Sequence, residues 1–172
     1  AFLNLSGKTV LLFGGGQVAL RKAKVLTRSG AVLTVVSREF SSPFSKWAKR
    51  NRIKLVRSTE IPPLTNAWLV VSATSDRAFN QRVYEACQRK RIFVNVVDDP
   101  NRSSFIVPSV VRRGGLQLAI STGGASPFLA KTIRKKLEQQ FGSEYTHLLQ
   151  KLAEDRAQAK ENMTAKERRN YF

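Results

Sequence analysis

A short apolar run that ends in three consecutive glycines constrains the fold of this chain more than any other feature. Residues 9–13, Thr-Val-Leu-Leu-Phe, have the composition of a buried parallel strand, and Gly14-Gly15-Gly16 follows at once. Residues 17–29 then place apolar side chains at helical spacing until Gly30, and residues 31–36 predict a second strand. A strand, a glycine turn, a helix and a strand within about 30 residues predict a βαβ unit.

The glycine turn predicts a dinucleotide site. Residues 14–19 fit the pattern G-x-G-x-x-G/A, with Ala19 in the last position. The first glycine, Gly14, makes the tight turn, and the second, Gly16, lets the backbone approach a pyrophosphate. The amides and the dipole at the start of the following helix favour the phosphates. A tight turn that binds nothing is the alternative.

The end of the second strand leaves the choice of cofactor open. An NAD site usually has an acid here, about 20 residues after the glycine turn. Glu39 reaches a ribose only if the chain bends back, whereas Arg38 suits the 2′-phosphate of NADP. We expect NAD as the cofactor, with NADP as the alternative.

The rest of the chain predicts an α/β protein of the Rossmann type. Its mostly parallel sheet takes further strands from residues 53–56, 68–72 and 92–97, with a helix capped by Ser75-Asp76 between the last two. Residues 105–108 and 110–112 are short and extended, Gly114-Gly115 predicts a turn, and 116–121 a strand. From Pro127 the composition is helical, with Gly142 between two helices. We expect a domain boundary near Gly114.

Composition favours a globular protein of the cytoplasm. Hydrophobic residues make up 42% of the chain, and no apolar run reaches the roughly 18 residues that span a bilayer, so we expect no membrane partner. The first residues lack the pattern of a signal peptide. The single cysteine, Cys87, predicts a core residue, and the single histidine, His147, a packing or surface residue, so we expect no metal site.

The net charge of +18 is unusual, with 30 Lys and Arg against 12 Asp and Glu. Residues 1–113 hold 20 of these basic and 6 of these acidic side chains, so the surplus does not come from a basic tail. Such a field attracts polyanions: nucleic acid, an anionic membrane or a polycarboxylate substrate. General solubility explains it equally well. We expect no nucleic-acid partner, because no helix-turn-helix, zinc or aromatic RNA-binding pattern is visible.

Five segments of the chain go beyond a generic dinucleotide fold. They are residues 14–23, 70–74 with Asn80 following, 94–100, 104–109 and 119–127. Together they resemble the precorrin-2 dehydrogenase / siroheme synthase family, which oxidises precorrin-2 to sirohydrochlorin in siroheme (porphyrin) biosynthesis. The resemblance covers roughly residues 4–140. Asn-Val-Val-Asp at 95–98 and Ser-Thr-Gly-Gly-Ala-Ser-Pro at 121–127 are its specific parts, because generic dinucleotide folds carry neither.

The resemblance implies an NAD-binding domain (residues 1–113), a dimerisation region (114–141), a small helical C-terminal domain (142–172) and a homodimer. It implies that Asp98 is the essential catalytic group. In some members this acid also serves ferrochelation, with Fe²⁺ as the inserted substrate. No methyltransferase module appears in these 172 residues, so we expect the stand-alone form of the family.

The residues themselves support part of this picture. Asp98 follows the fifth strand, where open α/β sheets place ligands, and a carboxylate there suits a general base, although Asp98-Asp99-Pro100 also fits a polar turn in which Asp99 is a cap. Ser126 predicts an N-cap before Pro127, and the loop before it is rich in donors for carboxylates. Arg112 and Arg134, with their basic neighbours Arg113, Lys131 and Lys135, either pair with substrate carboxylates or are solvated.

The candidate site residues therefore form three groups. The catalytic group is Asp98. The cofactor group is Gly14, Gly15, Gly16, Gln17, Val18, Ser37, Arg38, Thr74 and Asn95. The substrate group, for a tetrapyrrole, is Ser121, Thr122, Gly123, Gly124, Ser126, Arg112 and Arg134.

Three functions fit these residues. The first is an NAD-dependent precorrin-2 dehydrogenase, and the second is the same enzyme with sirohydrochlorin ferrochelatase activity. The third is a dinucleotide-binding sensor without catalysis that recognises a polyanionic partner. A sensor tolerates the loss of Asp98, whereas the dehydrogenase does not.

Overall fold

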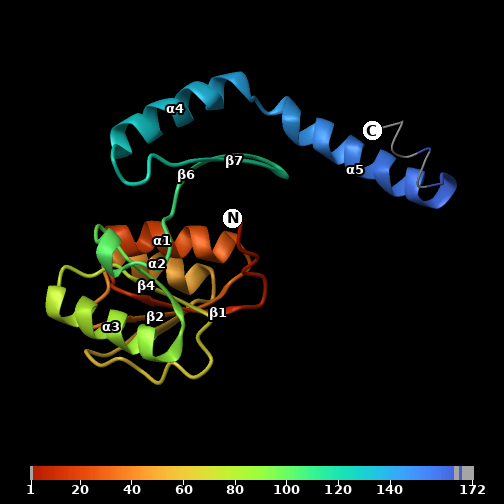
Figure 1. Cartoon of the computed structure of the whole chain (residues 1–172). Helices are drawn as coiled ribbons and strands as arrows, with labels where there is room; N and C mark the ends of the chain where they lie inside the picture. The colour runs from red at the N-terminus through yellow and green to blue at the C-terminus, as the bar shows by residue number, and fades with distance from the viewer. Residues whose placement is uncertain (1, 165–166, 168–172) are drawn as a thin grey trace. The chain divides into compact units, whose positions relative to one another are not determined.

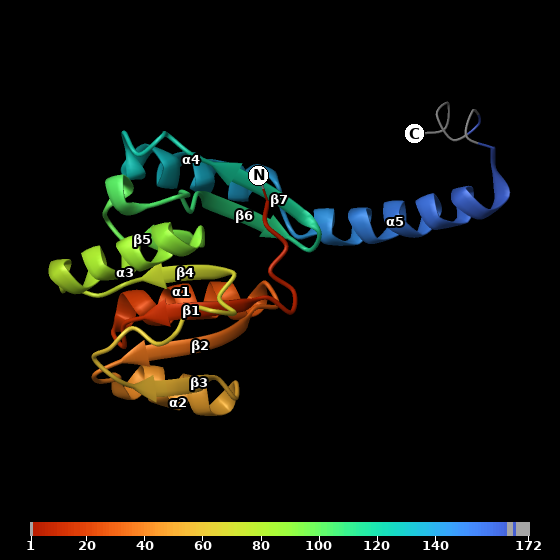
Figure 2. The same ribbon diagram turned by 60° about the horizontal axis from the view of Figure 1, so that its bottom comes forward.

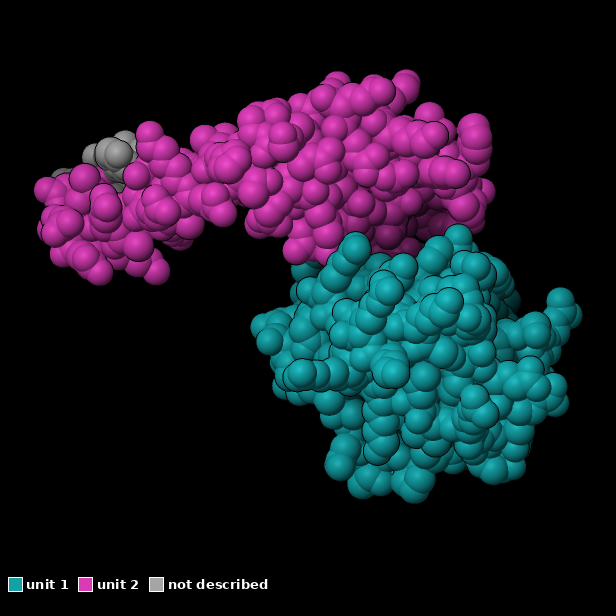
Figure 3. Space-filling view, turned by 180° about the vertical axis from the view of Figure 1, so that it is seen from behind, with its two compact units in different colours: residues 1–106 teal, residues 107–172 magenta. Residues whose placement is uncertain are grey.

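The computed structural model describes residues 2–164 and residue 167. The chain divides into two compact units, Ala1–Ile106 and Val107–Phe172, which are coloured separately in Figure 3. The division precedes the boundary near Gly114 that the composition suggested, because the extended residues before this glycine pair within the second unit. The two units are described in turn.

The first unit is built on a five-stranded parallel sheet with the order β3-β2-β1-β4-β5 (Figures 1 and 2). The strands are β1 (Thr9–Phe13), β2 (Val32–Ser37), β3 (Lys54–Arg57), β4 (Leu69–Ser72) and β5 (Phe93–Val96). The helices are α1 (Gln17–Arg28), α2 (Ser42–Arg50) and α3 (Arg77–Lys90), and a 3-10 turn, η1 (Pro100–Arg102), follows β5. The Rossmann-type fold predicted from the sequence is confirmed.

Helices cover both faces of this sheet, as alternate side chains of β1 show. Val10 and Leu12 pack in a core cluster with the apolar faces of α1 and α2. Leu11 and Phe13 pack in a second cluster with α3, where the Phe13 ring meets the Phe79 ring at 5.3 Å. A strand covered on both sides needs the continuous apolar run that residues 9–13 supply.

The strand order reverses at β1. The chain moves outward through β2 and β3, returns to β4 on the other side of β1, and continues to β5. The connections that leave the carboxyl ends of β1 and β4 therefore diverge, and open α/β sheets bind ligands in the crevice formed at such a switch point. The glycine turn leaves β1 at this place.

The expected elements are observed with small shifts at their ends, with one omission. Helix α2 was not predicted, although Ser41, Pro43 and the apolar Phe44, Trp47 and Ala48 are signals for its start and its buried face. The predicted cap of α3 is confirmed, since the Asp76 side chain accepts a hydrogen bond from the Phe79 amide.

The second unit has a small core. It comprises the antiparallel pair β6 (Ser109–Arg113) and β7 (Leu116–Ile120), followed by α4 (Pro127–Gln140) and α5 (Glu144–Asn162). Among its described residues, the buried apolar ones are Val111, Ala130 and Ala159. The predicted turn at Gly114 is confirmed, and the close approach of Thr146 to this glycine brings the start of α5 against the hairpin.

Candidate dinucleotide and catalytic site

Gly14 and Gly15 are required by the fold of the first unit itself. Gly14 has φ +119°, and a Cβ there would lie 2.4 Å from the carbonyl oxygen of Ala73 at the end of β4. A Cβ on Gly15 would lie 1.9 Å from the carbonyl oxygen of Glu39, after β2. Both glycines therefore allow neighbouring strand ends to close around the turn, and the sequence pattern had assigned this role to the first of them.

Gly16 is different, because nothing in the chain occupies the space beside it. A Cβ there would meet no atom within 4 Å, and the residue is exposed. Gly16 is the N-cap of α1, no side chain caps the helix, and its first turn holds no acid. Open space and uncapped amides at this point are what a pyrophosphate needs, so the turn fits a dinucleotide. Gln17 and Val18 begin the helix there, and buried Ala19 lets it pack on the strand.

The end of β2 carries an exposed charged pair. Arg38 and Glu39 lie 4.0 Å apart between Nε and Oε1, and both side chains are largely in solvent. The Ser37 hydroxyl donates to the Glu39 carbonyl at 2.8 Å, so the chain does turn back after the strand. Either side chain is free to reach a ribose, and the geometry does not choose between NAD and NADP.

A buried asparagine orders the chain at the end of β4. The Asn80 carbonyl oxygen accepts hydrogen bonds from the hydroxyls of Ser72 and Thr74, each at 2.7 Å, and its amide donates to the Thr74 carbonyl at 3.1 Å. The hydroxyl of Thr74, a predicted cofactor residue, therefore already donates its proton to a hydrogen bond within the chain. Asn80 was noted in the sequence as part of a resemblance only, since a clamp across a loop leaves no periodic signal.

Asn95 holds the segment that follows η1. Its amide donates to the Phe105 carbonyl at 3.0 Å and to the Ser103 hydroxyl at 3.4 Å, and the residue is buried. The Ser104 amide also donates to the Val94 carbonyl, which ties this segment to β5. Asn95 is thus a structural residue of the β5 end, and its contact with a cofactor stays a prediction.

The two acids after β5 have different surroundings. Asp98 is exposed and has φ +62°, a left-handed conformation that costs energy for a residue with a side chain. Asp99 caps η1 and pairs with Arg102 at 2.5 Å, and the Arg102 side chain, as donor, lowers the pKa of the Asp99 carboxyl. The interpretation of Asp99 as a structural cap is confirmed. The Asp98 carboxylate has no hydrogen bond or ion pair within the described part of the chain.

The first unit therefore brings together most of the predicted cofactor residues and Asp98. The glycine turn, the end of β2, the end of β4 and the end of β5 all lie at the carboxyl edge of one parallel sheet, whose strands run in the same direction in Figure 2. This edge includes the switch point at which such folds bind nucleotides.

The predicted substrate residues lie in the second unit. Ser126 is confirmed as the N-cap of α4, since its hydroxyl accepts from the Leu129 amide at 3.1 Å. Gly123 and Gly124 both have positive φ, and a Cβ on either would meet nothing within 4 Å. The adjoining hydroxyls bond within the loop: Ser121 accepts from the Gly123 amide, and Thr122 accepts from the Ser126 amide.

The two predicted arginines differ in availability. Arg112 is exposed on β6 and its side chain makes no hydrogen bond or ion pair within the described residues. Arg134 is partly buried and already paired with Glu138 on the next turn of α4, while Arg113 donates to the Glu138 carbonyl at 2.9 Å. Of the pair, Arg112 is the one free to meet a carboxylate without breaking an existing contact.

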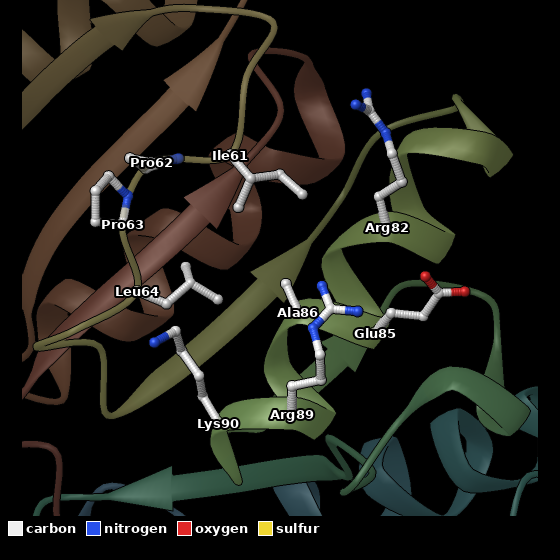
Figure 4. A pocket seen from close by; sticks show the side chains of 9 residues that line it. All are labelled: Ile61, Pro62, Pro63, Leu64, Arg82, Glu85, Ala86, Arg89 and Lys90. Carbon is white, nitrogen blue, oxygen red and sulfur yellow. The ribbon is translucent and has the colours of Figure 1, made fainter.

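Figure 4 shows a groove on the first unit whose lining residues do not include the glycine turn. Its volume is about 480 Å³, and it lies between residues 61–64 and the second half of α3. Because α3 begins at the carboxyl edge and runs back, this half lies toward the amino ends of the strands. Arg82 stacks over the Phe79 ring and Glu85 accepts from Gln81, so two of its charged groups have partners in the chain.

Other candidates from the sequence are accounted for. Cys87 is a buried core residue, as predicted, and burial raises the pKa of its thiol to about 11. His147 is exposed on α5. Within residues 2–164 and 167, no group of three His, Cys, Asp or Glu is placed to hold a metal ion, and no helix is long and apolar enough to cross a membrane.

Comparison with known proteins agrees with the two units. A family model described as "Putative NAD(P)-binding" matches residues 1–109, and one described as "Sirohaem biosynthesis protein central" matches residues 113–140. A solved structure, "SirC, precorrin-2 dehydrogenase", is 31% identical and superposes with a TM-score of 0.81, covering 99% of this chain and 85% of that one. The chain belongs to the precorrin-2 dehydrogenase / siroheme synthase family.

Curated relatives in this family are longer proteins. Siroheme synthase 1 of Yersinia pestis (strain Pestoides F) is 39% identical over 99% of this chain, and siroheme synthase 2 of Klebsiella pneumoniae is 42% identical over 99%. The chain spans 36% and 38% of the lengths of these two relatives, so it corresponds to about a third of each.

Proposed function

We propose that this chain is an NAD⁺-dependent dehydrogenase that oxidises precorrin-2 to sirohydrochlorin in siroheme biosynthesis. The observation that carries the proposal is the carboxyl edge of the sheet in a member of this family. There the open space at Gly16 and the uncapped start of α1 share one edge with the Asp98 carboxylate, which has no hydrogen bond or ion pair among the described residues. One feature suits a pyrophosphate and the other suits a general base.

Each part of this edge has a role in the reaction. NAD⁺ supplies a two-electron acceptor for hydride, and loss of two hydrogen atoms from the macrocycle then requires that one proton leave as well. Asp98 is the base that takes this proton, and its negative charge also offsets positive charge that develops on the macrocycle. The amides of Gln17 and Val18 bind the pyrophosphate, while Thr74 and Asn95 hold the loops that line the cofactor.

Substrate recognition in the proposal belongs to the second unit. Precorrin-2 carries acetate and propionate groups, and carboxylates suit the backbone donors of the loop at residues 121–127. Arg112, exposed and unpaired within the described residues, provides a planar guanidinium for one of these groups. Arg134 contributes only if it exchanges Glu138 for substrate.

A homodimer is part of the proposal, with the second unit as its interface. Leu148 and Leu152 lie one turn apart on α5, so they share a face, and they are 49% and 41% exposed. Phe128 on α4 is 79% exposed, and a two-stranded sheet is rarely stable alone. A second copy covers these residues.

The proposed homodimer is tested by measuring the mass of the protein in solution by light scattering. The double variant Leu148→Glu, Leu152→Glu should be monomeric, while Val32→Lys on the first unit, which replaces another exposed apolar residue, should not change the mass. A wild-type monomer at micromolar concentration contradicts the homodimer.

Because the proposed reaction draws on the cellular nicotinamide pool, we also propose that the protein is cytoplasmic.

The decisive experiment is anaerobic absorbance of the purified protein with precorrin-2 and NAD⁺ or NADP⁺. We expect sirohydrochlorin to form only with a nicotinamide, and Asp98→Asn to lower the rate at least about 100-fold with the dissociation constant for NAD⁺ within about twofold. A protein that binds NAD⁺ but oxidises nothing would instead be a sensor. Adding Fe²⁺ tests ferrochelation, in which iron is a substrate and Asp98 the candidate acid.

A further inference from the structure

Lys22 on α1 is a cation in an unusual position. Lys22 is partly buried, whereas the other three basic residues of this helix, Arg21, Lys24 and Arg28, are exposed. Its ammonium makes no hydrogen bond and no ion pair within the described residues. Burying a charged group without a partner costs free energy, and ionisable groups with perturbed surroundings cluster at functional sites.

The direction of the Lys22 side chain follows from the helix. Side chains of an α-helix lean toward its N-terminus, and α1 starts directly after the glycine turn. The long stem of Lys22 therefore runs back toward the carboxyl edge of the sheet, where the candidate site lies. The buried Ala19 and Ala23, which flank it on the helix, fix α1 against the sheet.

The end of β5 packs against a core cluster to which the same helix contributes. Val97 packs against the core cluster that contains Ala19 and Ala23, and Asp98 is the next residue in the chain. The left-handed conformation of Asp98 turns the chain immediately after this contact. Burial lowers the pKa of the Lys22 ammonium, the Asp98 carboxylate acts in the opposite direction, and Arg21 lowers it further. Lys22 and Asp98 thus interact electrostatically without a direct ion pair.

We propose that Lys22 is a positioning residue: its ammonium attracts the Asp98 carboxylate and keeps it turned toward the site. This inference rests on the proposed function of Asp98 as base. Asp99 does not take the place of Asp98, because it is paired with Arg102.

The electrostatic interaction between Lys22 and Asp98, called the pairing below, is tested without measuring catalysis. Lysines are dimethylated with ¹³C-formaldehyde, which keeps their charge, and are titrated by NMR; the Lys22 signal is the one missing from Lys22→Arg. Asp98→Asn removes the group that raises the pKa of Lys22, so the Lys22 signal should titrate at lower pH than in the wild type, while the Lys24 signal stays in place. Identical titration of Lys22 in both proteins overturns the pairing.

The role in the reaction is tested by kinetics at saturating NAD⁺. Lys22→Met keeps the apolar stem and removes the charge, and it should lower kcat about 10- to 100-fold with the KM for precorrin-2 and the melting temperature nearly unchanged. Lys22→Arg should restore most of the loss, and the exposed Lys24→Met should behave as wild type.

Three results overturn the positioning role. They are an unchanged kcat, an equal loss in the Met and Arg variants, and a raised KM with normal kcat, which would make Lys22 a substrate ligand. If the wild type itself does not oxidise precorrin-2, the proposed function fails, and the NMR titration still decides whether the Asp98 carboxylate acts on the Lys22 ammonium.

Discussion

Replacing Gly16 by aspartate should separate folding from cofactor binding, with opposite signs. Position 16 is the N-cap of α1, its backbone is extended (φ −90°, ψ −170°), and a Cβ meets nothing within 4 Å. Aspartate is among the best N-caps and exceeds glycine by a few tenths of a kcal/mol. Its charge gains about 0.3–1 kcal/mol more from the helix dipole. We expect the melting temperature of Gly16→Asp to stay level or rise by about 1–4 °C.

The same carboxylate should exclude the dinucleotide. It occupies the open space beside the first amides of α1, and a pyrophosphate brings two negative charges to that place. At about 5 Å and an effective dielectric constant near 20, each charge pair repels by about 3 kcal/mol, and solvent at this exposed edge reduces the total to about 2–4 kcal/mol. The dissociation constant for NAD⁺ should therefore rise roughly 30- to 1,000-fold.

The assay pairs calorimetric titration of NAD⁺ with thermal unfolding, and Gly14→Ala is the matched control from the same turn. Gly14 has φ +119° and an alanine Cβ would lie 2.4 Å from the Ala73 carbonyl oxygen. That variant should lose about 3 kcal/mol or more of stability and melt at least about 6 °C lower. Wild-type affinity in Gly16→Asp would refute the placement of the pyrophosphate, and a melting temperature as low as that of Gly14→Ala would refute the open space.

Three further predictions concern the same unit. Arg38→Ala should weaken NADP⁺ binding and leave NAD⁺ binding unchanged in parallel titrations, and equal affinities before and after the change would remove Arg38 from cofactor choice. Asp99→Asn should lower the melting temperature at pH 7, because Arg102 lowers the folded-state pKa of this carboxyl. The deficit should vanish as the pH falls below the unfolded value of 3.8 and through the folded pKa; a deficit independent of pH contradicts this. Cys87, buried with a thiol pKa of about 11, should resist iodoacetamide at pH 8 until the protein unfolds, and rapid labelling of the native protein contradicts its burial.

Local patterns predicted the centre of the first unit well. The run at 9–13, the glycine turn and the spacing of α1 all lie within one stretch of chain, and each supports the same βαβ unit. Helix α2 was not predicted because its nine residues make only about two and a half turns, and basic residues stand between its three buried apolar positions. Its Ser41 and Pro43 were the usable signal.

Contacts between distant segments were beyond the sequence. That Asn80 accepts hydrogen bonds from two hydroxyls at the end of β4, or that the Asp98 carboxylate raises the pKa of Lys22, depends on which loops the sheet brings together. The sequence pattern identifies the three glycines but does not show why each position needs glycine. Only the close approach of the Glu39 carbonyl shows that Gly15 is required by the fold. The dimer interface of the second unit stays a prediction, since the exposed leucines of α5 do not identify the molecule that packs against them.

The link between the glycine turn and the loop after β2 has a consequence for how this protein can change over evolution. The Ser41 amide donates to the Gly15 carbonyl at 2.9 Å, so the loop that carries Arg38 and Glu39 is joined to the turn by main-chain atoms. The side chains of residues 38 and 39 take no part in this link and extend into solvent. In a lineage that changes its nicotinamide cofactor, substitutions at residues 38 and 39 would therefore leave the main-chain link between this loop and the glycine turn intact.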